Sequence, residues 1–429
     1  MLDMKFVRDN PDIVRRDLER RGDAGKITLL DELLKVDSRW RTLLTELNKL
    51  REQRNAITEE IAKLRRTGSD ASSKIKEAET IPKRIKEGEE TLTKDRARMN
   101  EILMVLPNIM HDSVPDGKNE DDNVEIRSWG TVPEFDYSPK DHIDLATQLD
   151  LVDIERAARA SGARFYYLKN DLARLNWAIV CYALDFMRDK EFVIYQPPYM
   201  LHRRAVEGAV ALSDFEDVIY KIEGEDLYLL ATSEHALLNI HTDEILDSPS
   251  LPLRYCGISP CFRKEAGAHG RDTKGIFRVH QFEKVEQFIF SRPEQSWHEH
   301  ELMMRNAEEF FQQLGLPYRI VSVCSGELGT IAAKKYDLEV WLPGQGKYRE
   351  AVSCSNCTSY QAVRSNIRFR SKPNEPTQYV HTLNSTLVAT ERALVAIMEN
   401  YQLKNGTVVV PKVLRPYMRG LERIEKRRT

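Results

Sequence analysis

An apolar stripe that repeats at steps of three and four residues constrains the fold more than any other feature of the sequence. The first stripe runs from Leu29 to Leu64, with only Arg54 interrupting it, and a weaker second stripe runs from Ile75 to Leu106. A heptad pattern held for about five repeats is typical of a helix that pairs with another helix. Because Gly68-Ser69-Asp70 separates the two stripes, the pattern predicts an antiparallel helical hairpin.

Two residues of the second stripe are unusual for a helix interior. Pro82 and Gly88 predict a kink or a later helix start, and we take Pro82 itself as a position on the apolar seam. At about 1.5 Å per residue, each helix should be of order 50 Å long. Such a hairpin is too narrow to form a globule, so we expect it to project as an arm.

The charges of the hairpin allow two interpretations. Lysines and arginines nearly balance the acidic residues, as on an ordinary solvated coiled coil. The basic residues nevertheless gather near the turn, where they could contact the phosphates of a nucleic acid. The candidate contacts are Arg51, Arg54, Lys63, Arg65, Arg66, Lys74 and Lys76.

Composition limits the class of protein. A chain of 429 residues suggests two to three domains, and a net charge of −3 argues against a uniformly basic nucleic-acid binder. No apolar run of about 18 residues occurs, which argues against a membrane span, and the N-terminus lacks the apolar region of a secretory signal. Six cysteines are too few for a disulfide framework in so long a chain, so we expect a cytoplasmic protein.

The chain divides by pattern into three parts. Residues 1–110 hold the heptad hairpin, and residues 111–140 are rich in Asp, Asn and Gly, as a linker is. Residues 141–429 change to mixed helices and short strands. Within them, Leu172–Phe186 predicts an amphipathic helix and Glu191–Tyr195 a strand. Tyr336–Leu342 alternates at period two and predicts a half-buried strand.

Cysteines offer one candidate metal site. Cys354 and Cys357 form a CxxC pair, and with Cys256 and Cys261 they could supply four thiolates to zinc. The competing interpretation is that these are small, half-buried side chains in strands.

Neither of the common glycine-rich nucleotide-binding motifs, G-x-x-x-x-G-K-[ST] or G-x-G-x-x-G, occurs in the sequence, so any nucleotide must be held by side chains.

The densest polar stretch lies between Pro260 and Glu286. A strand with Arg263 and Glu265 enters a glycine-rich loop, and a second strand with Arg278, Phe282 and Glu286 leaves it. Arginine can fork to a phosphate or carboxylate, and a Phe ring can stack on a base. A salt-bridged surface hairpin is the alternative explanation of such a pattern.

This stretch resembles motif 2 of the class II aminoacyl-tRNA synthetases. Leu172 to Pro198 resembles their motif 1, and His381 to Arg392 followed by an apolar helix resembles motif 3, with Asn384-Ser-Thr386 similar to archaeal and eukaryotic members. Finer matches are to the seryl-tRNA synthetase family and span essentially the whole chain. They include Thr232-Ser-Glu234, Cys261-Phe-Arg-Lys-Glu-Ala-Gly267, Arg271-Asp-Thr-Lys-Gly275, Asp337-Leu-Glu-Val-Trp341, Ser353-Cys-Ser-Asn356 and Val413-Leu-Arg-Pro-Tyr-Met418.

The resemblance implies a role for each matching residue. Arg263, Glu350 and Arg392 are the implied catalytic residues, and Glu350 and Ser353 would hold Mg²⁺ together with ATP. The implied ATP-binding residues are Arg263, Lys264, Glu265, Val279, Phe282, Glu350, Ala351, Val352, Ser353 and Arg392. The implied serine-binding residues are Thr232, Ser233, Glu234, Arg263, Glu286, Asn384 and Thr386. Thr232-Ser233 also reads as an ordinary helix N-cap.

The fold implied by the resemblance is α+β. It joins an antiparallel coiled-coil arm that binds tRNA to a class II catalytic domain on an antiparallel sheet flanked by helices. The implied enzyme is a homodimer without structural zinc that forms seryl-adenylate from serine and ATP. It then transfers the seryl group to tRNA(Ser), and to tRNA(Sec) where that is present.

Two other functions would leave part of the sequence unexplained. An RNA-binding protein that has lost catalysis should lack one of Arg263, Glu286, Glu350 or Arg392, and all four are present. A function as a coiled-coil scaffold alone would not explain the sequence of residues 141 to 418.

Overall fold

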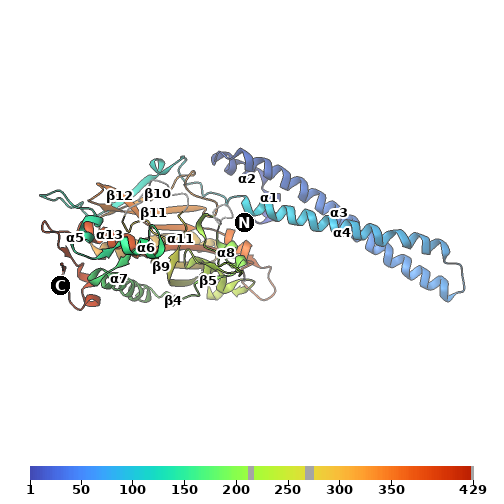
Figure 1. The fold of residues 1–429 in the computed structure, drawn as a ribbon. Helices are drawn as coiled ribbons and strands as arrows, with labels where there is room; N and C mark the ends of the chain where they lie inside the picture. Colours follow the sequence, from blue (N-terminus) through green and yellow to red (C-terminus); the bar gives the residue numbers. More distant parts are fainter. Residues whose placement is uncertain (211–216, 266–274, 427–429) are drawn as a thin grey trace. The chain divides into compact units, whose positions relative to one another are not determined.

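The computed structural model describes residues 1–210, 217–265 and 275–426. Two compact units make up the chain, Leu2–Leu106 and Pro107–Thr429, and Met1 belongs to the second. Figure 1 shows the helices of the first unit and the sheet of the second. Within the described residues, no helix combines the length and hydrophobicity that crossing a membrane requires.

The first unit is the predicted helical hairpin. Two short helices, α1 (Met4–Asp9) and α2 (Pro11–Arg20), precede α3 (Ala24–Arg66) and α4 (Ser72–Val105). The two long helices pack along each other, and the turn contains Gly68 with φ +69°. With 43 and 34 residues they span about 65 and 50 Å, so the first is longer than expected. The hairpin prediction is confirmed.

The predicted position of the seam on α4 is wrong by one residue over part of its length. Pro82 lies inside the helix but is exposed, whereas Ile81 is buried, and Gly88 and Asp95 are buried farther along the helix. A later helix start is also excluded, because α4 already begins at Ser72.

Contacts with α3 explain this register. A Cβ at Gly88 would lie 2.5 Å from Leu47 Cδ2, so only glycine allows the helices to approach here. Farther along the hairpin, buried Asp95 accepts from Arg39 Nε at 2.9 Å.

An eight-stranded sheet forms the centre of the second unit. The strand order is β1-β10-β11-β12-β15-β9-β8-β4, and every neighbouring pair is antiparallel except β4 and β8. The bounds are β1 Val124–Trp129, β4 Val193–Tyr195, β8 Leu253–Phe262, β9 Gln281–Ser291, β10 Tyr318–Ser322, β11 Lys334–Leu342, β12 Lys347–Asn356 and β15 His381–Ala389. This matches the α+β architecture that the sequence implied.

Helices cover the sheet and complete its core. The longer ones are α7 Asn170–Asp189, α11 Ser296–Leu314 and α13 Thr390–Asn400. The shorter ones are α5 His142–Gln148, α6 Ile154–Ser161, α8 Arg203–Ala209, α10 Glu234–Leu238 and α12 Tyr360–Ser365. Apolar side chains of α7, α11 and α13 join those of the central strands in one buried cluster.

Small sheets and turns complete the unit. The remaining strands are β2 Val152–Asp153, β3 Tyr167–Leu168, β5 Met200–Leu201, β6 Tyr228–Leu229, β7 Ile245–Asp247, β13 Arg368–Arg370, β14 Gln378–Tyr379, β16 Val408–Val409 and β17 Arg423–Ile424. The 3₁₀ turns are η1 Glu120–Asp122, η2 Asn239–His241, η3 Ser248–Ser250, η4 Pro293–Gln295, η5 Lys412–Leu414 and η6 Pro416–Met418.

Several local expectations can be compared with these elements. The helix and strand expected between Leu172 and Tyr195 are present as α7 and β4, and β11 alternates between buried and half-buried residues as expected. The segment 111–140 differs from a simple linker, because it contributes η1 and the edge strand β1, which pairs with β10. Its polar composition fits an edge strand, since most of β1 is exposed.

Candidate active site

A cavity of about 180 Å³ lies beside the central strands β9, β12 and β15. Most of the residues expected from the sequence line it: Thr232, Glu234, Arg263, Glu265, Val279, Phe282, Glu286, Glu350, Ala351, Ser353, Asn384, Thr386 and Arg392. Three expected residues do not line it. Ser233 is buried behind it, Val352 belongs to the main core, and Lys264 is held by a bond from its N–H to Val218 O (3.0 Å).

Adjacent strands explain why residues distant in the sequence meet here. Glu286 on β9 faces Gly257 on β8 and Thr386 on β15 in the strand register. Antiparallel neighbours lie about 5 Å apart, so side chains at these positions share one surface of the sheet. The first turn of α13 adds Arg392 directly after β15 ends at Ala389.

One end of the cavity holds a hydrogen-bond network around Glu286. Its Oε2 accepts from the hydroxyl of Thr232, from Ser233 Oγ (3.2 Å) and from the N–H of Glu234 (3.3 Å). Lys284 Nζ donates to Glu286 Oε1 (2.9 Å) and to Thr232 Oγ1 (2.8 Å). Burial favours the neutral acid, but the Lys284 ammonium and these donors hold the pKa of Glu286 below its usual value.

Glu234 lies beside this network, and its pKa shifts in the opposite direction. Its Oε1 accepts from Gln361 Nε2 (2.6 Å) and Asn384 Nδ2 (3.1 Å). Burial, together with the nearby charge of Glu286, raises the pKa of Glu234 to about 7. A buried carboxylate with neutral amide partners is suited to receive a cation, because its charge has no buried counterion of its own.

The N-cap interpretation of Thr232-Ser233 holds only in part. Ser233 is the N-cap of α10, but its side chain makes no capping bond. The hydroxyl of Thr232 instead accepts the N–H of Glu234 at 3.2 Å.

Arginines gather at the other end of the cavity. Arg263 lies over the ring of Phe282, with 5.3 Å between the guanidinium carbon and the ring centroid, and its Nε donates to Ala231 O (3.2 Å). Arg392 lies over the ring of Phe277 at 5.2 Å and forms an ion pair with Glu350 (3.1 Å). Guanidinium groups beside aromatic faces can bind phosphates and stack on a base.

A larger hollow of about 860 Å³ adjoins this end and shares Glu350, Ser353 and Arg392 with the cavity. Asp337 on β11 lies directly across from Ser353 on β12, and its buried Oδ1 has no hydrogen-bond partner in the described residues. Burial, together with the charge of Glu350, raises the pKa of Asp337 to about 7. These carboxylate and hydroxyl oxygens are the donor types that Mg²⁺ prefers.

The ends of the two motif 2 strands differ from the prediction. The strands β8 and β9 end at Phe262 and begin at Gln281, so Arg263, Glu265 and Arg278 lie beyond them rather than on them. The N–H of Arg263 still bonds to His280 O (2.9 Å), and Arg278 pairs with Glu265 (2.8 Å). The expected glycine-rich loop, with Arg271, lies mostly outside the described residues.

The four cysteines considered as zinc ligands do not converge. Cys256 and Cys261 lie on β8 and Cys354 on β12, with β9 and β15 between them. Three strand spacings amount to about 14 Å, far beyond a shared metal ion. All four are buried free thiols, and the described residues contain no group of three or more His, Cys, Asp or Glu that could hold a metal.

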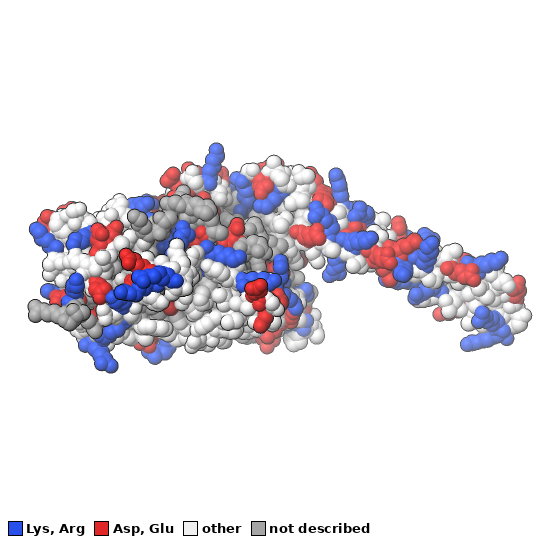
Figure 2. Space-filling view, in the orientation of Figure 1, with Lys and Arg blue, Asp and Glu red and all other residues white. Residues whose placement is uncertain are grey.

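The candidate tRNA contacts lie on the hairpin of the first unit. Arg54, Lys63, Arg65, Arg66 and Lys76 are exposed. The other two are half-buried and paired, Arg51 with Glu89 (2.8 Å) and Lys74 with Glu60 and Glu77 (both 3.1 Å). Figure 2 shows basic and acidic side chains interspersed along this hairpin.

Sequence reasoning did not single out four of the residues that line the cavity: Phe277, Lys284, Ala389 and Glu391. A signal existed for Lys284, because it lies two residues before Glu286 and therefore on the same face of β9. Glu391 precedes Arg392, and its buried Oε2 has no partner in the described part of the chain.

Comparisons with known proteins agree with this geometry. The family model "Seryl-tRNA synthetase N-terminal domain" matches residues 1–110, and "tRNA synthetase class II core domain (G, H, P, S and T)" matches residues 217–401. A serine–tRNA ligase from Methanoculleus marisnigri is 54% identical over 429 residues, covering 98% of this chain and 100% of the relative.

Two solved structures are also similar. Seryl-tRNA synthetase from Pyrococcus horikoshii, complexed with ATP, has 51% identity and a TM-score of 0.96, and both chains are covered completely. Cytoplasmic serine–tRNA ligase from Naegleria fowleri, in complex with AMP, has 36% identity and a TM-score of 0.90, with 100% of this chain and 99% of that one covered. The chain therefore belongs to the seryl-tRNA synthetase family of class II aminoacyl-tRNA synthetases.

Proposed function

We infer that the protein is a serine–tRNA ligase that joins serine and ATP to form seryl-adenylate and pyrophosphate, and then transfers the seryl group to the 3′-terminal adenosine of tRNA(Ser) with release of AMP. The observation that carries this inference is a single cavity with two chemically different ends. Carboxylates and hydroxyls at one end suit a small amino acid, and arginines beside aromatic rings at the other suit a nucleotide.

We assign adenylate formation mainly to positioning and charge. Arg263, at the arginine-lined end, would hold the α-phosphate and stabilise its charge while the serine carboxylate attacks and pyrophosphate leaves. Arg392 would bind the γ-phosphate, and Phe282 and Glu265 would hold the adenine. Glu234 would receive the serine ammonium, while Glu286 and Thr386 would receive its hydroxyl. Their arrangement around one cavity supports these roles.

We propose that Mg²⁺ enters this site together with ATP. Glu350 and Ser353 would bind it, and the oxygens at this edge, including the unpartnered Oδ1 of Asp337, fit a hard divalent cation. Bound there, the ion would neutralise charge on the phosphates.

We propose that the tRNA contacts lie on the basic residues of the α3–α4 hairpin. This assigns tRNA binding to residues 1–110, the connection to 111–140 and catalysis to 141–429. Long RNA arms are recognised largely through backbone and shape, which an exposed hairpin can contact over its length. tRNA(Sec), where present, would be bound in the same way.

The six free cysteines support a reducing compartment, the cytoplasm, as the location of the protein.

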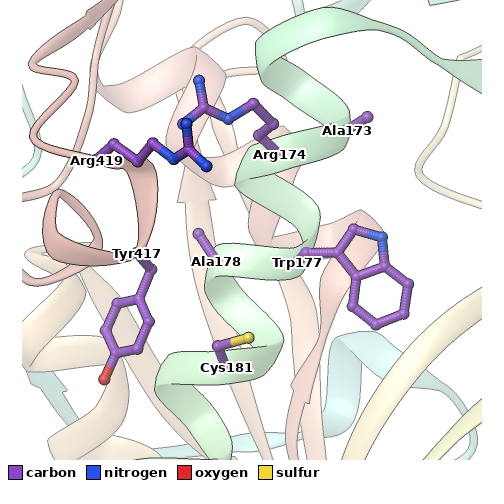
Figure 3. A pocket seen from close by; sticks show the side chains of 7 residues that line it. All are labelled: Ala173, Arg174, Trp177, Ala178, Cys181, Tyr417 and Arg419. Carbon is purple, nitrogen blue, oxygen red and sulfur yellow. The ribbon is translucent and has the colours of Figure 1, made fainter.

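We propose a homodimer formed through α7 and the edge strand β4. Trp177 on α7 is 59% exposed and Val193 on β4 is 53% exposed, an unusual amount of apolar surface on one region. Figure 3 shows Trp177 and Cys181 on successive turns of α7, beside a pocket that Tyr417 also lines. Sedimentation velocity should give a dimer for the wild type and a monomer for Trp177→Glu; a wild-type monomer at micromolar concentration would exclude this interface.

Pyrophosphate exchange tests the activity. ATP should exchange label with pyrophosphate when serine is present, and far less with alanine, threonine or glycine. Equal exchange with several amino acids, or none with serine, would contradict the assignment. Charging of tRNA(Ser) by the same preparation tests the second step.

A further inference from the structure

The ammonium group of Lys284 lies buried at the amino-acid end of the cavity. The residue is 4% exposed and sits on the central strand β9, between β8 and β15, where its side chain cannot reach solvent around a sheet edge. It contributes to the wall of the cavity together with Thr232, Glu286 and Thr386. A lysine in such a place is costly unless it has a partner, so its position calls for a specific explanation.

The hydrogen bonds around Lys284 can be counted group by group. The Thr232 hydroxyl donates its one proton to Glu286 and accepts from Lys284 Nζ (2.8 Å) and the Glu234 N–H (3.2 Å), so it is saturated. Three donors already occupy Glu286 Oε2, whereas Oε1 accepts only from Lys284 among the described residues. Lys284 in turn uses two of its three N–H bonds.

One acceptor position and one donor position therefore remain side by side at the wall of the cavity. A hydroxyl group needs both, because it has one proton to donate and lone pairs that accept. Building on the proposed function, we propose that Lys284 is a specificity-determining residue: its third N–H donates to the side-chain oxygen of the substrate serine while Glu286 Oε1 accepts the proton of the same hydroxyl.

This arrangement explains how a small cavity can reject alanine. Alanine would fill the space but would leave both Lys284 and Glu286 without their last partner, and unpaired buried polar groups are strongly unfavourable. Sites built to hydrogen-bond a substrate hydroxyl reject the analogue that lacks it by about 10⁴–10⁵. The ion pair also keeps Glu286 ionised in a buried site, which makes it a stronger acceptor.

The test replaces the ammonium with an apolar chain of similar length. In Lys284→Met, we expect kcat/KM for serine in pyrophosphate exchange to fall at least 100-fold, with KM for ATP within threefold of wild type. The preference for serine over alanine should fall by a similar factor. Replacing Lys334, a strand lysine that lies over Tyr336 (4.8 Å) and lines neither cavity, by Met is the matched control and should change neither value.

A substrate that brings its own cation separates recognition from simple structural support. L-2,3-Diaminopropionate carries an ammonium where serine has its hydroxyl, so Lys284 should repel it in the wild type. In Lys284→Met it should pair with Glu286, and the ratio of diaminopropionate to serine activity should rise at least 100-fold. A ratio unchanged from wild type would overturn the proposal.

A second variant covers the case in which the unpaired carboxylate of Lys284→Met prevents folding. The double change Lys284→Met with Glu286→Gln removes both charges, and it should bind ATP by calorimetry while losing discrimination between serine and alanine. A double variant that folds and still prefers serine as strongly as wild type would refute the role. Wild-type exchange that does not depend on serine would instead refute the proposed function, so the two failures are distinguishable.

Discussion

Arg263→Ala is the most direct test of how the two ends of the cavity work together. The side chain lies over Phe282 (5.3 Å) and its Nε bonds to Ala231 O (3.2 Å), while the rest of the guanidinium remains available to ligands. Burial raises the pKa of Glu234, and the charge of Arg263 limits that rise; after Arg392, it also helps to keep the pKa of Glu350 below its usual value. Removing it should therefore weaken phosphate binding and leave Glu234 less ionised, so that serine binding also suffers.

The expected cost to folding is smaller than the cost to catalysis. A cation–aromatic contact contributes about 0.5–2 kcal/mol, and one hydrogen bond from a charged group about 1.5–3 kcal/mol. Because Arg263 is partly exposed, we expect a loss of stability of about 2 kcal/mol and a fall in Tm of a few degrees. Losing a group that stabilises transition-state charge costs about 3–4 kcal/mol, or about 10²–10³ in rate.

Serine-dependent pyrophosphate exchange and thermal unfolding should be measured on the same preparation. Arg368→Ala is the matched control. Arg368 on β13 lies over the ring of Tyr379 (5.0 Å), and it lines neither the cavity nor the adjoining hollow. The control should lose stability by a similar amount but keep its exchange rate. Exchange by Arg263→Ala within about threefold of wild type would refute the role of Arg263.

Three other predictions concern separate parts of the molecule. Replacing Leu29–Leu106 by a Gly-Ser linker should leave pyrophosphate exchange nearly intact, because α3 and α4 bury their apolar residues against each other. The same deletion should reduce tRNA charging by orders of magnitude. Charging at the wild-type level would show that the hairpin is only a solvated coiled coil. Purified protein should carry no stoichiometric zinc by elemental analysis, and Cys357→Ser should stay active; zinc at about one per chain, lost with activity on chelation, would contradict this. Burial raises the pKa of Glu234 to about 7, so its carboxyl becomes neutral below that pH. We therefore expect kcat/KM for serine to fall by up to tenfold per pH unit below about pH 7. A flat profile from pH 8 to 6 would count against a role of Glu234 in serine binding.

The sequence predicted those elements whose cause is local. Heptad spacing sufficed for the hairpin, and period-two alternation sufficed for β11, because each pattern directly reflects which side of an element is buried. The exact seam of α4 was not predictable in this way. Ile81 and Pro82 are adjacent, and it is Ile81 that joins Ile57 of the facing helix in a buried cluster, a contact that the local spacing does not reveal.

Within the site, family motifs predicted most of the cavity lining but not how its charges are arranged. Lys284 and Asp337 both lie on strands whose polar residues could equally face solvent. Their roles depend on partners from other strands or segments, Thr232 for Lys284 and Ser353 for Asp337. The spacing of apolar and polar residues within one segment does not show which distant segment it pairs with. The contacts of these residues could therefore be found only in the folded structure.

Two buried carboxylates in one small cavity raise a problem of charge that the network resolves. Glu234 and Glu286 cannot both stay ionised at low cost in a buried site without compensating cations. Lys284 is bonded to Glu286 and not to Glu234, so one carboxylate is held ionised while the other keeps a raised pKa. In the function proposed above, the ammonium of the incoming amino acid is the cation that Glu234 lacks, and binding it would favour the ionised form. That proposal divides amino-group recognition and hydroxyl recognition between two acids that differ mainly in whether the protein supplies the counterion.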